Sequence, residues 1–497
     1  MKKLYILPAL LLLSGLASAQ TVNDIVRYST TTNTGSARST AMGGAFGALG
    51  GDLSSIVVNP AGIGEFRKAE VSITPSLNIA KTKSDDRVSN QLSLQLGTLG
   101  GVFVFHNPNS SWRGFNLGIN YNNLNNFNRT TSQYVYNSGT SFTEILALEA
   151  NKYGASGGRE KMALNAGLIS FNNETGFFEP TLLPEEEVTQ RKHIREDGYQ
   201  GGYDLTFGAN YKDKLYLGMT IGVQNIHYKF ESVFMGKGDT GNFFGLDKYT
   251  VGQYLKTQGI GTNFKFGMIY RPIPELRIGA AVHSPTFFSM KDTYSEDAYS
   301  EFYEPDENND CSYRSYITPA TYNYDMQTPW KLVISAATVL MQKATLSVDY
   351  EYSNYTLARF SNGDDVEDFY TADGTGANDQ IISELKATHN FRAGVEYRLN
   401  NTVSLRGGYA YWDSPYKMSS MPTLLRSNLK IQAISAGFGT NFGMFFIDAA
   451  YVCKFSKDIT SFYFYQDSFD SADDIIANPL HNKYANHEGR ITLGMRF

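Results

Sequence analysis

Apolar side chains recur at every second position, in segments of roughly ten residues, along most of this chain. At the start of the pattern, Val71, Ile73 and Leu77 share one face, and polar residues share the other. A period of two is typical of a β-strand with one apolar face. About fourteen such segments occur, an even number as in bacterial single-chain barrels. They cover residues 69–81, 91–106, 114–124, 199–211, 215–228, 259–270, 275–288, 328–341, 343–354, 385–399, 402–413, 429–442, 444–455 and 485–497.

The connections between these segments are short and long in turn. Residues 212–214 join two segments, whereas residues 125–198 form the largest gap. The mean hydropathy is −0.31, and no long apolar run follows the N-terminal region, so membrane-spanning helices are not expected. In a bilayer only a helix or a closed barrel satisfies every backbone polar group, and only a barrel fits alternating segments. We therefore expect an all-β fold: a transmembrane antiparallel β-barrel of about 14 strands with long extracellular loops.

A soluble periplasmic β-sandwich or propeller would also explain the alternation and the turns. It would not explain why the connections are short on one side and long on the other. The 33 Tyr and 32 Phe are also many for a soluble globular chain. The net charge of −6 suggests no nucleic-acid partner.

Both ends of the chain carry signals that are typical of an exported barrel. Two lysines precede an apolar run too short to span a bilayer, and an A-x-A cleavage site ends at Ala19, so residues 1–19 are predicted to be a signal peptide. At the other end, RITLGMRF is an alternating strand that closes on Phe497. This terminal aromatic resembles the signal read by the outer-membrane barrel assembly machinery. We expect the chain to lie in the bacterial outer membrane, in contact with its lipid and lipopolysaccharide.

Residues 20–66 precede the first alternating segment and are too few to fold alone. Because they are glycine-rich and apolar, exposure in the periplasm would favour aggregation, and a barrel of about fourteen strands is too wide to be filled by its own side chains. We expect these residues to plug the lumen as a hatch, with the barrel following at residues 67–497. Within the hatch, Asp52 is placed to cap a short helical turn. Pro60 ends that turn by restricting Asn59, and Gly62 permits a sharp exit into the first strand.

The long gap at residues 125–198 contains one segment with helical periodicity. Phe142, Ile145 and Leu146 lie near one face of this segment, and Ser141 is placed to cap it. A short amphipathic helix over the barrel mouth is therefore predicted. Its apolar side chains either receive a hydrophobic solute or pack among themselves.

The stretch TAMGGAFGALGGDLSSIVVNPAGIG, residues 40–64, resembles the hatch of the FadL/TodX family of outer-membrane transporters for long-chain fatty acids and hydrocarbons. The motif is Asn59-Pro60-Ala61, preceded by GGAF and Asp52. The resemblance covers residues 38–65 in motif and the whole chain in layout. It implies passive uptake of a hydrophobic small molecule, which binds first among the outer loops and then inside the barrel. The solute then leaves sideways into the membrane, where the third strand kinks inward.

The resemblance also implies roles for particular residues. The third strand is expected at residues 114–124, where Gly114 and Gly118, on either side of Phe115, permit a kink or are ordinary strand glycines. The family pocket uses basic groups for a carboxylate, and the lumen-facing candidates in this chain are Lys265, Arg392 and Arg406. They alternatively belong to a structural ion-pair network with Asp349, Glu351, Glu396 or Asp448.

Other function classes receive less support from the sequence. A haem or hemin receptor stays an alternative, although the 7 His form no tight ligand pair. A structural or adhesive barrel is another, and it would carry a solid plug without a pocket. A barrel enzyme is not expected because no G-x-S-x-G elbow occurs, so we predict no catalytic residue, metal site or cofactor. The 2 Cys, Cys311 and Cys453, make no disulfide framework.

Overall fold

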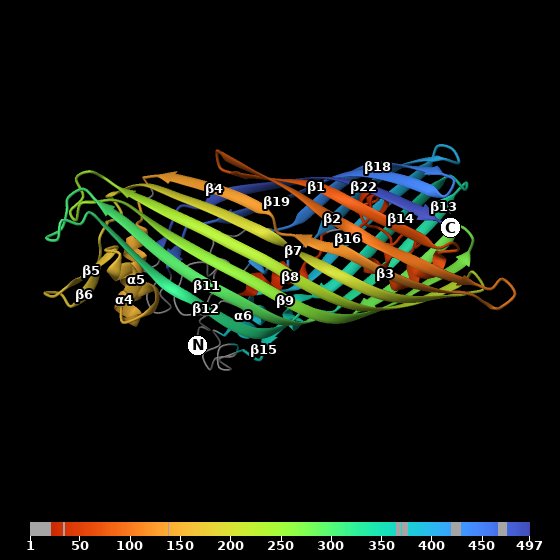
Figure 1. Cartoon of the computed structure of the whole chain (residues 1–497), viewed down its shortest axis with the longest axis horizontal. Helices are drawn as coiled ribbons and strands as arrows, with labels where there is room; N and C mark the ends of the chain where they lie inside the picture. Colours follow the sequence, from red (N-terminus) through yellow and green to blue (C-terminus); the bar gives the residue numbers. More distant parts are fainter. Residues whose placement is uncertain are drawn as a thin grey trace.

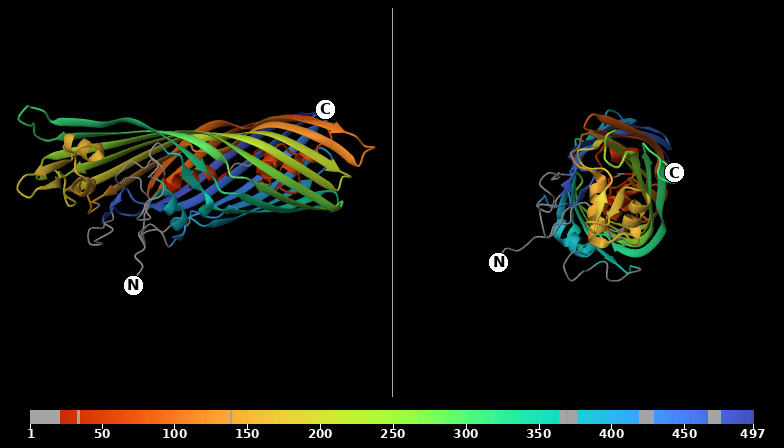
Figure 2. Two further views of the ribbon diagram at one scale, coloured as in Figure 1. Left: turned by 90° about the horizontal axis from the view of Figure 1, so that it is seen from below. Right: turned by 90° about the vertical axis from the view of Figure 1, so that its left-hand side faces the viewer.

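The computed structural model describes residues 21–32, 35–137, 139–363, 369, 376–418, 429–465 and 475–497. The predicted signal peptide, residues 1–19, lies outside these described residues. The chain forms one long barrel, with the N-terminal segment inside it (Figure 1; Figure 2). No helix in the described part of the chain is long and apolar enough to cross a membrane.

The barrel wall is a closed antiparallel sheet of 14 strands, so the predicted fold class is confirmed. Closure is made by pairing of the first strand with the last, from Glu70–Arg496 to Ser84–Asn482. Three wall strands are each built from two consecutive elements, β3 with β4, β10 with β11, and β12 with β13. The wall elements are β1 (Glu70–Ser84), β2 (Arg87–His106), β3 (Trp112–Asn126), β4 (Arg129–Tyr136), β7 (Glu187–Tyr211), β8 (Leu215–Gly238), β9 (Leu246–Ile273), β10 (Leu276–His283), β11 (Phe287–Phe302), β12 (Ser312–Gln327), β13 (Lys331–Leu340), β14 (Ala344–Asn354), β16 (Ala387–Arg398), β17 (Val403–Trp412), β18 (Ile431–Phe442), β19 (Phe445–Thr460) and β22 (Leu480–Arg496).

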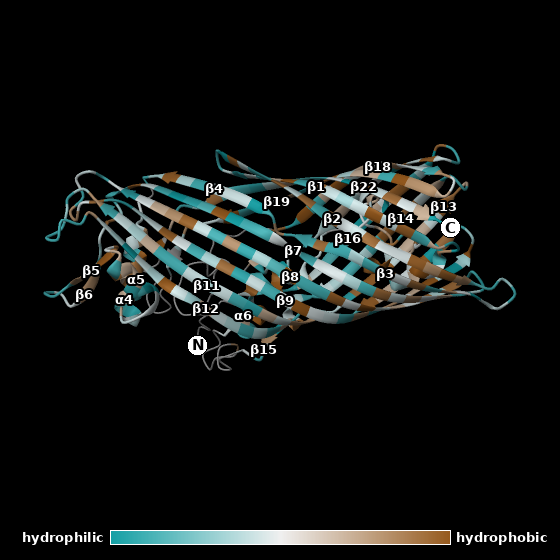
Figure 3. Cartoon of the chain, in the orientation of Figure 1, coloured by the Kyte–Doolittle hydropathy of each residue, from teal (hydrophilic) through white to brown (hydrophobic). Residues whose placement is uncertain are grey.

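Burial along the strands is opposite to that of a soluble protein. On β1, Val71, Ile73 and Leu77 point outward and are exposed, whereas Ser72 and Thr74 point inward and are buried. In Figure 3 the apolar residues gather on the strands in the half of the barrel that carries the C-terminus. An apolar outer face with a polar lumen is what a wall surrounded by lipid requires.

The two ends of the barrel differ, and we name them by their connections. At the turn end, short connections such as residues 212–214 join the strands, and the C-terminus lies there as well. At the opposite loop end the strands are very unequal, because β9 has 28 residues and β8 has 24, whereas β14 has 11 and β17 has 10. At about 3.3 Å per residue, β9 runs for about 90 Å, far more than a bilayer crossing needs.

The sequence pattern did not reveal these extensions. The predicted gap at residues 125–198 contains β4 and the first half of β7, and the segments predicted at 215–228 and 259–270 continue well past those limits. The reason is that the extended strands are polar on their outer face, as at Lys229 and Glu231 of β8. Outside the lipid, a strand no longer needs an apolar outer face, so the period of two in hydropathy is lost.

The remaining elements lie inside the barrel or at its loop end. The hatch contains α1 (Val22–Ser29), α2 (Ala37–Ala41), α3 (Ser55–Val58) and the 3₁₀ helix η1 (Pro60–Glu65). Helices α4 (Phe142–Tyr153) and α5 (Gly158–Asn165) lie across the loop end, as the right-hand view of Figure 2 shows. Smaller elements complete the described chain: β5 (Ile169–Asn172), β6 (Phe177–Pro180), η2 (Tyr355–Leu357), β15 (Arg359–Ser361), α6 (Ala377–Glu384), β20 (Phe464–Tyr465) and β21 (Ile475–Ile476).

Candidate functional site

The hatch is folded by local hydrogen bonds around Asp52. One carboxylate oxygen of Asp52 accepts from the Ser54 amide at 2.9 Å, and both accept from the Ser36 hydroxyl at 2.9 Å. The Ser55 amide donates to the Asp52 carbonyl at 2.9 Å, which begins the turn that leads into α3. Asp52 thus ties the two arms of the hatch together in addition to holding the turn for which the sequence suggested it.

The Asn59-Pro60-Ala61 motif links the hatch to the wall. The Oδ1 atom of Asn59 accepts from the Ala61 amide at 3.1 Å and so caps η1, which Pro60 begins. Its Nδ2 atom donates to the Gly47 carbonyl at 2.6 Å and to the Met268 carbonyl of β9 at 3.1 Å. A single buried amide therefore closes one turn, joins two parts of the hatch and contacts the barrel.

A belt of glycines in the wall receives the hatch, a feature that the sequence reasoning missed. A Cβ atom built on Gly218 would lie 2.2 Å from the Pro60 carbonyl carbon, and one on Gly408 would lie 2.1 Å from the Gly43 amide nitrogen. On three neighbouring strands the belt residues are directly opposite one another, as Gly208–Gly218–Gly267. Members of this glycine belt are Gly118, Gly208, Gly218, Gly267, Gly279, Gly394, Gly408 and Gly437. Because these positions lack side chains, the backbone of the hatch can approach the wall directly.

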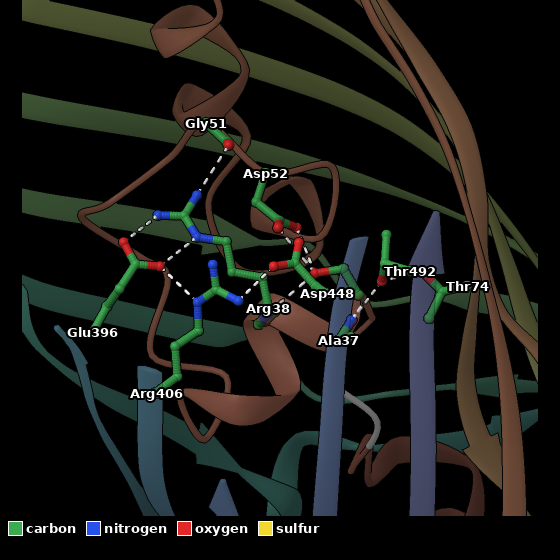
Figure 4. Close-up of polar contacts among 11 residues, drawn as sticks. Ala37, Arg38, Gly51, Asp52, Thr74, Glu396, Arg406, Asp448 and Thr492 are labelled. Carbon is green, nitrogen blue, oxygen red and sulfur yellow. Dashed lines mark hydrogen bonds and ion pairs between the residues drawn. The ribbon is translucent and has the colours of Figure 1, made fainter. Parts of the chain in front are cut away.

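A buried ion-pair network joins the hatch to the wall (Figure 4). Arg38 of α2 donates to both oxygens of Glu396 on β16 at 2.9 and 3.1 Å, and to the Gly51 carbonyl at 3.3 Å. Arg406 of β17 donates to Glu396 at 2.7 Å and also to Asp448 of β19. Two cations from different parts of the chain thus share one carboxylate, which lowers the cost of burying it.

The other two predicted ligand-binding cations are also engaged within the protein. Lys265 donates to both oxygens of Asp204 at 3.1 and 3.3 Å, and Arg392 pairs with Glu351. With Arg406, all three candidates therefore bond to internal carboxylates, whereas Asp349 accepts from the Gly47 amide of the hatch at 3.0 Å. These contacts give the three cations a structural role in the wall. At each cation, a ligand carboxylate would have to compete with an internal carboxylate.

The apolar cluster around α1 of the hatch, which we call the apolar compartment, consists of buried side chains. Val22, Ile25 and Tyr28 of α1 pack there against inward-facing residues of the wall. Lys331 holds the end of α1 by donating to the Ser29 carbonyl and to the Thr31 hydroxyl, both at 3.1 Å. The wall residues of this compartment include Ile226, Tyr228, Phe288, Met290, Tyr324, Met326 and Phe360. The sequence reasoning missed it because the same inward face is polar nearer the turn end, for example at Thr220 and Gln224 of β8.

A seam in the wall lies on the loop-end side of the third strand, between β2 and β3. Strands β2 and β3 pair from His106–Gly114 only as far as Thr98–Asn122. Beyond that point residues 87–97 of β2 have no backbone partner on this side among the described residues, and β3 and β4 pair with β7 alone. We call this the β2–β3 seam.

Side chains bridge the seam where the backbone ladder stops. Gln91 accepts from the Thr130 hydroxyl at 2.9 Å and donates to Asp197 at 2.7 Å. Asn123 donates to Gln95 at 3.2 Å. Asn126 donates to Ser93 at 3.4 Å, and Gln91 also donates to the Glu196 carbonyl at 3.5 Å. Side-chain hydrogen bonds of this kind exchange readily with water and cost little net free energy to open.

The residues suggested for a kink lie outside the seam. Gly114 and Gly118 sit in the regular part of the β2–β3 ladder, and Phe115 faces outward and is exposed. A Cβ atom on Gly118 would lie 2.5 Å from the Ile63 side chain, so this glycine makes room for the hatch. The only register shift near Gly114 is between β3 and β7. The asparagine-rich run that follows Asn120 would have been the better sequence signal for the seam.

The helix predicted at the barrel mouth exists, and its apolar face is not open. Phe142, Ile145 and Leu146 of α4 are fully buried in a cluster with Met162 of α5 and Phe234 of β8. They pack among themselves and against the wall, which is the second of the two predicted possibilities. We call residues 139–186, which contain α4, α5, β5 and β6, the cap.

A buried carboxylate fixes the start of α4. Glu187 accepts from the Phe142 amide at 3.2 Å and from the Tyr249 hydroxyl at 2.9 Å. Burial in the cap raises the pKa of Glu187 to about 7, although these hydrogen bonds oppose the shift. No group of three or more metal-ligating side chains occurs among the described residues, and both cysteines are free thiols.

The chain is similar to known proteins in its family and in its fold. The model of the family described as outer membrane protein transport protein (OMPP1/FadL/TodX) matches residues 203–461, just over half of the chain. No curated protein matches. A FadL homologue from Pseudomonas aeruginosa is similar with 12% identity and a TM-score of 0.56, covering 94% of this chain and 99% of its own. The toluene transporter TodX of Pseudomonas putida has 12% identity and a TM-score of 0.51, covering 94% and 100%. At such identities these structures support the fold.

Proposed function

Because this chain belongs to the OMPP1/FadL/TodX family and is an outer-membrane transport barrel rather than an enzyme, we propose that it carries hydrophobic small molecules from the outside into the membrane itself. The solute enters at the loop end, which faces outward, and reaches the apolar compartment around α1. It then leaves laterally through the β2–β3 seam. The observation that carries this proposal is the seam, where the backbone ladder between β2 and the third wall strand stops and side chains join the two.

The hatch supports a sideways route. Its backbone lies against the glycine belt, and ion pairs and hydrogen bonds attach it to many strands of the wall. A solute that moved straight through would have to displace the whole hatch. The seam, in contrast, is bridged by hydrogen bonds from side chains rather than by a backbone ladder. Lateral exit also keeps an apolar solute out of the aqueous periplasm, and each CH₂ group returned to water costs about 0.8 kcal/mol.

The lumen favours a neutral solute such as a hydrocarbon over a fatty acid. A fatty-acid carboxylate would have to compete with Asp204, Glu351 or Glu396 for the three lumen cations. Breaking one of these buried pairs would leave an internal carboxylate without its partner, which costs several kcal/mol. An apolar solute needs only to replace side chains such as Val22 and Ile25 in the compartment.

A disulfide across the seam tests the route. In a background of Cys311→Ser and Cys453→Ser, the pair Ser93→Cys and Asn126→Cys would join the two lips of the seam. We expect oxidation to stop uptake of a hydrocarbon into proteoliposomes and reduction to restore it. The matched control is Thr98→Cys with Asn122→Cys, whose hydroxyl and amide oxygens are already 2.9 Å apart within the paired ladder. Unchanged uptake through the oxidised seam would refute lateral exit, whereas a block by both disulfides would point to a general effect on the barrel.

Three further assignments are part of the proposal and are supported by the sequence pattern. Residues 1–19 act as a signal peptide. Residues 20–66 form the hatch, and residues 67–497 form the barrel. The C-terminal residue Phe497 is recognised by the barrel assembly machinery. In the folded barrel the Phe497 amide donates to the Ala69 carbonyl at 3.0 Å, next to the start of β1. Replacing Phe497 with Ala should slow assembly of the barrel in cells without changing its folding in detergent, since the side chain is exposed.

A further inference from the structure

Three lysines form a single row across three neighbouring strands on the outer face of the barrel. Lys83 of β1 lies directly opposite Lys483 of β22, and Lys483 lies directly opposite Lys457 of β19. Lys81, two positions away on β1, shares the same face. All four side chains are exposed, and we call them the lysine cluster.

The directly opposite pair Lys83 and Lys483 is unfavourable for the protein alone. Directly opposite residues of antiparallel strands have Cβ atoms about 5 Å apart, and like charges in these positions destabilise the sheet. Among the described residues, no carboxylate forms an ion pair with Lys81, Lys83 or Lys483. Two acidic residues, Asp85 and Asp86, lie in the turn between β1 and β2, and the Asp85 carboxylate accepts from the His481 amide at 3.4 Å. An external anion would relieve the repulsion.

The lysine cluster lies where the apolar outer face ends. On β1 the outward-facing Leu77 and Ile79 precede Lys81, and on β19 the outward-facing Tyr451 and Phe455 precede Lys457. The next connection on β1 is the short turn at Asp85, so the cluster is also close to the loop end of this part of the wall. In an outer-membrane barrel with its loop end outward, this level corresponds to the headgroups of the outer leaflet.

We propose that the lysine cluster binds the phosphate groups of the anionic glycolipid of the outer leaflet, that is, of lipopolysaccharide. Ammonium groups bind phosphate as compact point charges, and a row of three spaced at about 5 Å can engage more than one phosphate on a single glycolipid. Phe455 lies two positions before Lys457 on the lipid side of the row, and Tyr451 lies four positions farther along the same face; both contact the acyl chains. The site thus combines cations for the headgroup with apolar groups for the tails.

The cluster and the seam share one hairpin. The outer face of β1 carries Lys81 and Lys83, while the inner face of β2 contributes Gln91, Ser93 and Gln95 to the seam. Bound glycolipid therefore holds the outer lip of the seam in place. Binding of the glycolipid is independent of the proposed function. The influence of this binding on solute exit, in contrast, rests on that function.

The test uses the full chain in nanodiscs, with lipid binding followed by native mass spectrometry. The probes are bis-phosphorylated lipid A and its dephosphorylated form. We expect the first to bind more tightly than the second, and we expect millimolar inorganic phosphate not to displace it. In Lys81→Gln/Lys83→Gln/Lys457→Gln/Lys483→Gln the affinity should fall by about tenfold or more, because each surface lysine contributes about fivefold near an anionic headgroup.

The chain offers a control with the same change in charge. Lys68, Lys212, Lys214 and Lys343 are exposed at the turn end, and their replacement by Gln should leave lipid A binding unchanged. Replacing the lysine cluster by Arg should retain binding, which separates loss of charge from misfolding. The proposal is overturned if the Gln variant of the cluster binds as tightly as the native chain, or if both forms of lipid A bind alike. Uptake of a hydrocarbon is measured separately. A result that refutes lateral exit through the seam therefore leaves the proposal of lipid A binding untouched.

Discussion

The hatch and the cap both close the barrel, but they are held by different interactions. The hatch is attached to the wall by Arg38, by Asn59 and by contact of its backbone with the glycine belt. The cap is held by an apolar cluster in which Phe142, Ile145 and Leu146 are fully buried. The hatch also buries apolar side chains such as Phe46 and Ile63 against the wall, but its polar contacts reach several strands, whereas the cap is held mainly by apolar contacts. The comparison indicates that loss of a buried ring should loosen the cap most, and that loss of a close backbone contact or an ion pair should loosen the hatch.

The largest expected effect comes from the cap. Phe142→Ala should lower the free energy of unfolding of the cap by about 3–5 kcal/mol, because it removes a fully buried ring and leaves a cavity. Urea titration with limited proteolysis of residues 139–186 would measure it. The matched control is Phe177→Ala, which removes a ring that is 61% exposed. Equal effects of the two substitutions would show that the cap is not a packed unit.

The second test concerns the glycine belt. Gly218→Val should destabilise the seating of the hatch by about 3 kcal/mol, since no side chain fits next to Pro60. Single-channel conductance should rise as the hatch is displaced. Gly489→Val is the control, because a Cβ atom there meets nothing within 4 Å. Unchanged conductance of the Gly218→Val variant would mean that the hatch moves freely away from the wall.

The third test removes one charged contact of the hatch. Arg38→Met should cost about 2 kcal/mol, because two charged hydrogen bonds to Glu396 are lost while Arg406 still pairs with that carboxylate. Arg67→Met, which removes an exposed pair with Asp213 at 3.4 Å, should cost less than about 1 kcal/mol. Unfolding in urea would compare them. A larger loss for the exposed arginine would contradict the assignment of Arg38 as an anchor.

A smaller effect per pH unit is the pH dependence that burial of Glu187 should give the cap. The pKa of Glu187 is raised to about 7 by burial, above its value in an unfolded chain, so the folded cap binds a proton that the unfolded chain releases. Stability of the cap should therefore fall as pH rises from about 4.5 to about 7, by about 1 kcal/mol over the last pH unit. Glu187→Gln should remove this dependence. The dependence would have to come from another group if it persisted in that variant.

Much of the hatch and barrel could be predicted because each depends on local patterns. Alternation such as Val71, Ile73 and Leu77 is required wherever a strand faces lipid, and it revealed 14 strands. The Asn59-Pro60 pair acts through its own backbone, so its turn could be predicted without neighbours. The contacts of Lys265, Arg392 and Arg406 could not, because their partners come from other strands and depend on the register of the closed sheet.

The sequence by itself determined the closed barrel, the number of its strands and the position of the hatch, because lipid imposes a period of two and an apolar plug needs a lumen. Only the tertiary structure decided how far β7 to β12 extend, where the β2–β3 ladder stops and which glycines receive the hatch. The physical reason is that these features arise from the pairing of residues far apart in the chain. A glycine such as Gly218 looks like any strand glycine until Pro60, 158 positions earlier in the numbering (218 − 60), is brought against it.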